Sequence, residues 1–92
     1  MKKHIFISGR VQGVGFRHFT KTNARELGVN GWVKNLSDGR VEAYLDGEEK
    51  AVKELIERCK NGPAASYVKN IEENKVSDKQ AEEVNGFEVK FS

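Results

Sequence analysis

The sequence predicts an α+β fold, with two helices on one face of a mostly antiparallel sheet of four or five strands. Two stretches carry apolar residues at helical spacing, and shorter stretches of alternating or β-branched residues lie before, between and after them. This βαββαβ order, with a possible additional strand, is the ferredoxin-like split βαβ sandwich. At 92 residues, the chain is expected to form one domain, residues 1–92, without a separate cofactor domain.

The first strand and the first helix are predicted on either side of a glycine-rich loop. Residues 3–8 are β-branched and aromatic at their centre, which favours a strand. From Phe16 onward, apolar and small residues recur every three or four positions, and Gly28 is well placed to end a helix. The residues with this helical spacing are Phe16, Phe19, Thr20, Asn23, Ala24 and Leu27.

A hairpin is expected next. Residues 29–36 and 40–46 both alternate as strands do, and the segment Ser37-Asp38-Gly39 between them is a strong turn signal. In the second strand we expect Val41, Ala43 and Leu45 to face inward and Glu42, Tyr44 and Asp46 to face outward.

The second helix is predicted over residues 48–60, ending at Asn61-Gly62-Pro63. Its apolar stripe consists of Val52, Leu55, Ile56 and Cys59. Two more strands are expected near residues 67–73 and 87–91, and the polar stretch 74–85 between them has no predicted structure.

Composition excludes several classes of protein. Hydrophobic residues make up 37% of the chain, and 16 Lys and Arg nearly balance 14 Asp and Glu, which fits neither a disordered chain nor an obligate nucleic-acid binder. The single cysteine allows no internal disulfide and no cysteine metal cage. The apolar runs are too short for a membrane span, and no signal-peptide pattern follows Met1. We therefore expect a cytoplasmic protein without membrane or nucleic-acid partners.

The glycine-rich segment Gly9–Arg17 is the main candidate site. Glycines let successive backbone N–H groups converge on an anion, and the helix start adds unpaired N–H donors. Arg17, in the first helical turn, could supply a bidentate fork for phosphate or carboxylate. The simpler alternative is a tight connection with a surface arginine. Neither the Walker loop nor the dinucleotide fingerprint fits, because Val14 and His18 stand where those motifs need glycine.

Other polar candidates are weaker when taken alone. Asn35 ends a strand beside a turn, where asparagine most often forms the turn. His4 and His18 have no metal-ligand spacing with Cys59, which continues an apolar stripe and is expected to be a buried small hydrophobe. We therefore expect no metal site.

Two segments together resemble the acylphosphatase family. Gly9-Arg-Val-Gln-Gly-Val-Gly-Phe-Arg17 matches the family signature G-x-V-Q-G-V-x-F-R at every fixed position. Gly31-Trp-Val-Lys-Asn35, followed by Asp38-Gly39-Arg-Val41, matches G-W-V-x-N-x-x-D-G-x-V equally well. The order, the spacing, the chain length and the Asn61-Gly62-Pro63 segment also fit, so the resemblance spans the whole chain.

The resemblance implies a metal-independent enzyme, without an organic cofactor, that hydrolyses acyl phosphates to a carboxylate and inorganic phosphate. Arg17 and Asn35 correspond to the family's catalytic residues. The phosphate-binding loop, acting through backbone N–H groups, corresponds to Val11, Gln12, Gly13, Val14, Gly15 and Phe16. The expected partner is a small acyl phosphate, and the expected state is a monomer.

Two rival functions remain for this fold, an RNA-binding module and a non-catalytic metabolite sensor or domain of a larger carbamoyl-transfer enzyme. Against RNA binding, Glu42 and Asp46 flank Tyr44 on the same strand face and would repel phosphate. The intact pair Arg17 and Asn35 favours catalysis over sensing. A neutral amide such as Asn35 can orient a water without repelling the substrate.

Overall fold

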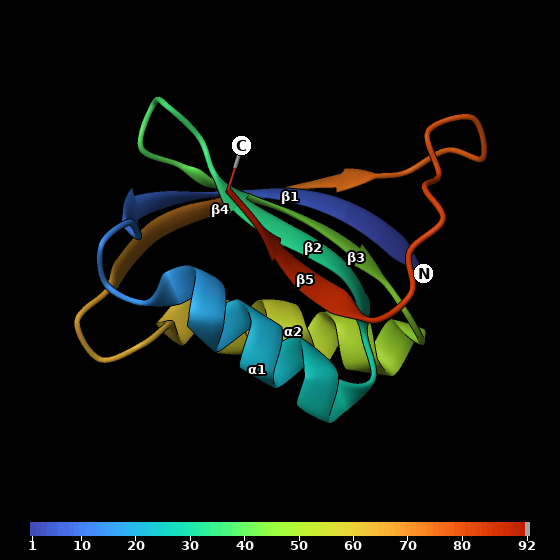
Figure 1. Cartoon of the computed structure of the whole chain (residues 1–92), viewed down its shortest axis with the longest axis horizontal. Coiled ribbons are helices and arrows are strands. Elements are labelled where there is room, and N and C mark those ends of the chain that lie inside the picture. The colour runs from blue at the N-terminus through green and yellow to red at the C-terminus, as the bar shows by residue number, and fades with distance from the viewer. Residues whose placement is uncertain (92) are drawn as a thin grey trace.

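The computed structural model describes residues 1–91, which form five strands and two helices (Figure 1). In chain order the elements are β1 (Lys2–Arg10), α1 (Phe16–Leu27), β2 (Asn30–Asn35), β3 (Val41–Asp46), α2 (Glu49–Asn61), β4 (Tyr67–Lys75) and β5 (Phe87–Lys90). Every strand and helix lies where the sequence predicts it, and the bounds differ by two residues or fewer. Hydrophobic periodicity was therefore sufficient to locate the elements.

The strands form one sheet in the order β4-β1-β3-β2-β5. β1 is antiparallel to both β3 and β4, and β2 is antiparallel to β3 but parallel to β5. Both helices lie against the same face of this sheet (Figure 1). The predicted α+β ferredoxin-like sandwich is confirmed, with β5 as the additional strand beside β2.

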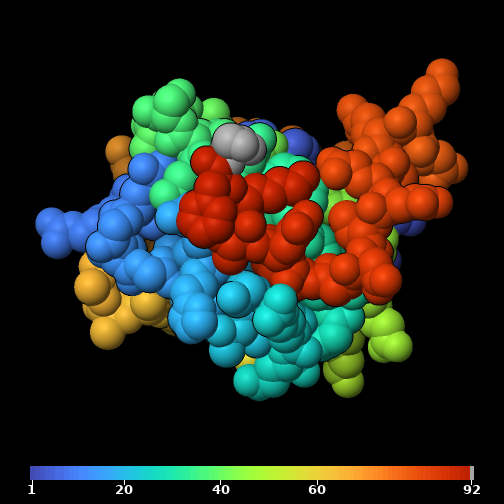
Figure 2. All heavy atoms as spheres, in the orientation of Figure 1, coloured from blue at the N-terminus to red at the C-terminus, as the bar shows by residue number. Residues whose placement is uncertain are grey.

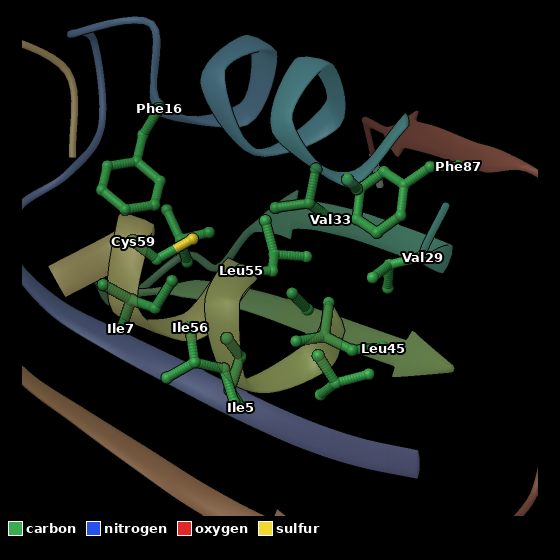
Figure 3. Close-up of a cluster of buried hydrophobic side chains, with 14 of the residues drawn as sticks. Ile5, Ile7, Phe16, Val29, Val33, Leu45, Leu55, Ile56, Cys59 and Phe87 are labelled. Atoms are coloured by element: carbon green, nitrogen blue, oxygen red, sulfur yellow. The ribbon is translucent and has the colours of Figure 1, made fainter. Parts of the chain in front are cut away.

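The core lies between the helices and the inner face of the sheet. Figure 3 shows side chains of α2, including Leu55, Ile56 and Cys59, packed between those of the strands and Phe16 at the start of α1. The predicted stripe of α2 is confirmed, since Val52, Leu55 and Cys59 are fully buried and Ile56 is nearly so. Phe16 itself is 1% exposed, which fixes the start of α1 on the sheet.

Neither helix among residues 1–91 has the length and apolar character needed to cross a membrane.

The stretch 74–85 begins as the end of β4 and continues as an irregular segment over the outer face of the sheet. Glu82 anchors it, because its backbone N–H donates to Tyr44 Oη at 3.0 Å and its carboxylate accepts from Trp32 Nε1 at 3.0 Å. Tyr44 lies on the outer face as predicted, but this segment covers it and leaves it 1% exposed. Trp32 stacks beside Tyr44, with ring centroids 6.2 Å apart, and is also buried. The outer face therefore lacks an open aromatic surface at Tyr44.

Candidate active site

Strand direction brings several distant segments to one end of the sheet. Since β1 and β2 are both antiparallel to β3, they run in the same direction, and β5 runs parallel to β2. The carboxyl ends of all three strands therefore meet at the end where α1 begins. Figure 2 shows β5, in red, beside α1, in light blue. A cavity of about 470 Å³ lies there, bounded by the β1–α1 loop, α1, the end of β2 and β5.

Six of the eight predicted site residues line this cavity together: Val11, Gly13, Gly15, Phe16, Arg17 and Asn35. Val11 and Phe16 are buried, so they hold the ends of the loop on the core. The predicted loop and the two predicted side chains thus face one common space, although Asn35 is 18 residues from Arg17 in the sequence.

The loop is shaped to receive an anion. Gly13 and Gly15 both adopt left-handed backbone conformations, with φ of 73° and 78°, which turn successive N–H groups toward one side. Among the described residues, no hydrogen bond uses the N–H groups of residues 12–18. Helix α1 has no side-chain cap at Gly15 and no acidic residue in its first turn. Its N-terminal donors and the positive end of its dipole are therefore free to act on a bound anion.

Gln12 and Val14 do not line the cavity. Val14 packs against the hydrophobic core. The Gln12 side chain instead reaches the β2–β3 turn. There its Nε2 donates hydrogen bonds to Leu36 O at 2.7 Å and to Arg40 O at 2.9 Å. Gln12 thus connects the β1–α1 loop to the turn that follows Asn35, a contact in addition to the backbone role predicted for it.

The β2–β3 turn that accepts these bonds is itself well ordered by local contacts. The Arg40 N–H donates to Asp38 Oδ1 at 3.1 Å, and Arg40 Nε donates to Asp38 Oδ2 at 2.9 Å. These bonds, chiefly the one from the backbone N–H, lower the pKa of Asp38. Gln12 is therefore anchored to a rigid turn.

Arg17 projects from the first turn of α1 and is half-buried. Its guanidinium carbon lies 4.7 Å from the centre of the Phe91 ring, a stacking contact that restrains the side chain. Within residues 1–91, no carboxylate forms an ion pair with Arg17. Arg17 therefore lines the cavity beside a neutral, aromatic neighbour and is not neutralised by a carboxylate of the described residues.

Asn35 is the last residue of β2 and its side chain is partly buried. Its Oδ1 atom is fully buried and has no hydrogen-bond partner among the described residues. A buried acceptor without a partner is costly to a fold, and such atoms in native proteins call for a functional explanation. Here the atom belongs to a residue that lines the same cavity as Arg17.

The sequence analysis missed several residues of this cavity. Lys21 and Arg25 line it from α1, and Glu88 and Phe91 line it from the end of the chain. The spacing of four residues from Arg17 to Lys21 and on to Arg25 was a readable signal, since such residues share one helix face. Nothing in the local sequence marks Glu88 or Phe91, because they reach the cavity through the β2–β5 pairing.

Of the other reactive groups, His18 also lines the cavity and is exposed to solvent. Residues 1–91 contain no cluster of three or more His, Cys, Asp or Glu side chains arranged to hold a metal ion. Cys59 is fully buried, and burial raises its pKa to about 12. The thiol is therefore the buried small hydrophobe that the sequence predicts, and it is unsuited to act as a nucleophile.

Comparison with known proteins identifies the family of the chain. The acylphosphatase family model matches residues 3–89. The chain is 54% identical over 72 residues to an acylphosphatase of Chloroflexus aurantiacus, covering 78% of each chain. It is 46% identical over 90 residues to an acylphosphatase of Trichormus variabilis, covering 98% of this chain and 86% of the relative.

A solved structure shows the same architecture. The structure of an acylphosphatase from Coxiella burnetii superposes with a TM-score of 0.89 at 37% identity, covering 97% of this chain and 90% of that one. Both family signatures fall within the matched residues 3–89 and supply the loop, Arg17 and Asn35 of the cavity. With this match across nearly its whole length, the chain belongs to the acylphosphatase family of enzymes.

Proposed function

We propose that this cavity hydrolyses the carboxyl–phosphate bond of acyl phosphates by direct attack of water, using Arg17, Asn35 and the backbone of the β1–α1 loop. The observation that carries the proposal is the buried, unpartnered Asn35 Oδ1 in the same cavity as Arg17 and the free loop N–H groups. A side-chain amide that can orient a water thus lies in the same cavity as an array of donors for an anion.

In this scheme the loop and Arg17 hold the phosphate. The N–H groups of residues 12–18 and the helix dipole stabilise its negative charge, and the Arg17 fork binds two of its oxygens. Phosphoryl transfer depends mainly on positioning and on stabilising charge on the equatorial oxygens. Donors preorganised in the folded protein meet both demands without rearranging during the reaction.

Asn35 positions the nucleophile. Its side-chain amide, turned toward the cavity, hydrogen-bonds the attacking water and directs the water's lone pair at phosphorus. The new P–O bond forms as the bond from phosphorus to the acyl oxygen breaks, and the acyl group leaves as a carboxylate. The water's proton passes to a phosphate oxygen of the substrate, because neither Arg17 nor Asn35 can accept it and the scheme assigns no role to His18, which also lines the cavity. The products are a carboxylate and inorganic phosphate, and no metal takes part.

Steady-state hydrolysis of benzoyl phosphate tests these roles. Arg17→Ala should raise KM and lower kcat together, because it removes a contact to the phosphate in both ground and transition states. Asn35→Ala should mainly lower kcat, by about 10²-fold or more, as for the loss of one oriented catalytic group. Asn70→Ala, an exposed asparagine on β4, is the matched control and should keep wild-type kinetics.

The assay should give the same rates with and without EDTA. Wild-type turnover in either Arg17→Ala or Asn35→Ala would refute the assigned role of that residue. We also expect the monomer to be the active form. Light scattering would measure the molar mass under the assay conditions. A specific activity that rises with the fraction of dimer would contradict this expectation.

A further inference from the structure

The active-site cavity carries more positive charge than one phosphate requires. Arg17, Lys21 and Arg25 all line it, spaced four residues apart along one face of α1. A spacing of four residues advances about 6 Å along a helix. The cations therefore form a row that leads away from the phosphate loop toward the carboxyl end of α1.

The three cations are not equally available to a substrate. Arg17 is assigned to the phosphate in the proposed mechanism. Arg25 donates from Nη2 to Phe87 O at 3.0 Å and so helps to hold α1 against β5. Lys21, which is half-buried, forms no ion pair and no side-chain hydrogen bond with any residue in 1–91. Lys21 is thus the cation of the row that remains available.

The one carboxylate residue of the cavity does not neutralise Lys21. Glu88 is exposed and forms no ion pair within the described part of the chain. It lies between Phe87 and Val89, which face the core, and its register partner is Trp32 on the outer face. Strand alternation therefore directs the Glu88 side chain toward the outer face of the sheet, although the residue itself borders the cavity.

We propose that Lys21 is a specificity-determining residue that favours acyl phosphates whose acyl group carries a second negative charge. The inference rests on the proposed function, since it requires the phosphate to occupy the β1–α1 loop. With the phosphate there, a second carboxylate or phosphate about 6 Å further along α1 meets the Lys21 ammonium. An acyl group without a charge leaves this ammonium in contact with solvent only.

Two benzoyl phosphates of nearly equal size test this preference. 4-Carboxybenzoyl phosphate carries the second negative charge, and 4-carbamoylbenzoyl phosphate is its neutral counterpart. Neither can cyclise, because the substituent lies across the ring from the acyl phosphate. The measured quantity is the ratio of their kcat/KM values, and comparing this ratio between variants cancels the intrinsic reactivity of the two compounds. A third compound, 4-phosphonobenzoyl phosphate, carries a phosphate-like second anion. Its kcat/KM, compared with that of 4-carboxybenzoyl phosphate, shows which of the two anions the site prefers.

The wild-type ratio should exceed that of Lys21→Gln by roughly threefold to tenfold, as expected for one partly screened ion pair. The effect should lie mainly in KM and shrink as salt is added. Lys21→Arg should keep most of the preference. Lys69→Gln, which removes the same charge from exposed β4, is the control for long-range attraction and should keep the wild-type ratio.

Equal ratios in wild type and Lys21→Gln would overturn the inference, and so would an equal fall in Lys69→Gln. If the wild type hydrolysed benzoyl phosphate but showed no such dependence on Lys21, only this inference would fail. If the wild type failed to hydrolyse benzoyl phosphate at all, the proposed function would fail and this inference with it.

Discussion

The contact between Gln12 and the β2–β3 turn leads to a quantitative prediction. Gln12→Ala removes two hydrogen bonds, to Leu36 O at 2.7 Å and to Arg40 O at 2.9 Å, which join segments 24 and 28 residues apart. These bonds connect the β1–α1 loop to the turn after Asn35. The substitution should therefore weaken the fold and also let the loop move relative to Asn35 in the proposed catalytic site.

The loss of stability can be estimated from the hydrogen bonds that the two carbonyl groups keep after the substitution. Leu36 O still accepts from Gly39 N at 3.2 Å, and Arg40 O still accepts from Leu36 N at 2.8 Å. Neither carbonyl is left without a partner, so the loss is the net value of two ordinary hydrogen bonds rather than a desolvation penalty. We expect the free energy of unfolding to fall by about 2 kcal/mol and Tm to fall by roughly 8–16 °C.

Thermal and urea unfolding would measure the stability loss, and benzoyl phosphate kinetics would measure the effect on the site. We expect Gln12→Ala to raise KM several-fold, because a displaced loop binds the phosphate less well. Ile56→Val, a substitution in the core on α2 that costs about 1 kcal/mol, controls for destabilisation alone and should leave KM unchanged. An unaltered Tm in Gln12→Ala, or an equal rise of KM in Ile56→Val, would refute the reasoning.

Two further substitutions test the fold. Gly31→Ala should prevent folding, seen as loss of the far-UV circular dichroism of the native protein, because the added Cβ would stand 1.8 Å from Tyr44 O on β3. Gly47→Ala is its control and should fold normally, since its Cβ would meet atoms only at ordinary contact distances of 3.5 Å and more. Burial raises the pKa of Cys59 from 9.0 to about 12, so the folded chain keeps a proton that the unfolded chain releases. Stability measured by urea unfolding should therefore fall more steeply between pH 9 and pH 12 in the wild type than in Cys59→Ala; parallel pH profiles would contradict the raised pKa.

Most of the architecture could be predicted from the sequence because its signals are local. The apolar residues of α2 repeat at helical spacing, and those of β3 occur at every second position. The sequence of each element therefore indicates which of its faces is buried. Part of the site is local as well. Gly13, Gly15 and Arg17 lie within one connection between a strand and a helix, and glycine at these positions permits the left-handed turns that shape the loop.

The rest depends on pairings between distant segments. The residues next to Gln12 in the sequence do not indicate its hydrogen bonds to the β2–β3 turn. In the same way, the residues next to Tyr44 do not indicate the segment that covers it. Both are contacts across 24 residues or more, so they exist only once the sheet order is set. The prediction that Tyr44 is outward therefore identified the correct face but could not tell that this face is covered.

By itself, the sequence determined the helices, the strands, the buried faces and the residues that could carry phosphate chemistry, because backbone conformation and side-chain periodicity act over a few neighbouring positions. Only the tertiary structure decided that Lys21 shares one cavity with Arg17 and Asn35 and that Phe91 stacks on Arg17. The reason is the direction of the strands. With β1, β2 and β5 parallel to one another, three distant carboxyl ends meet at the start of α1, and no local pattern encodes that meeting.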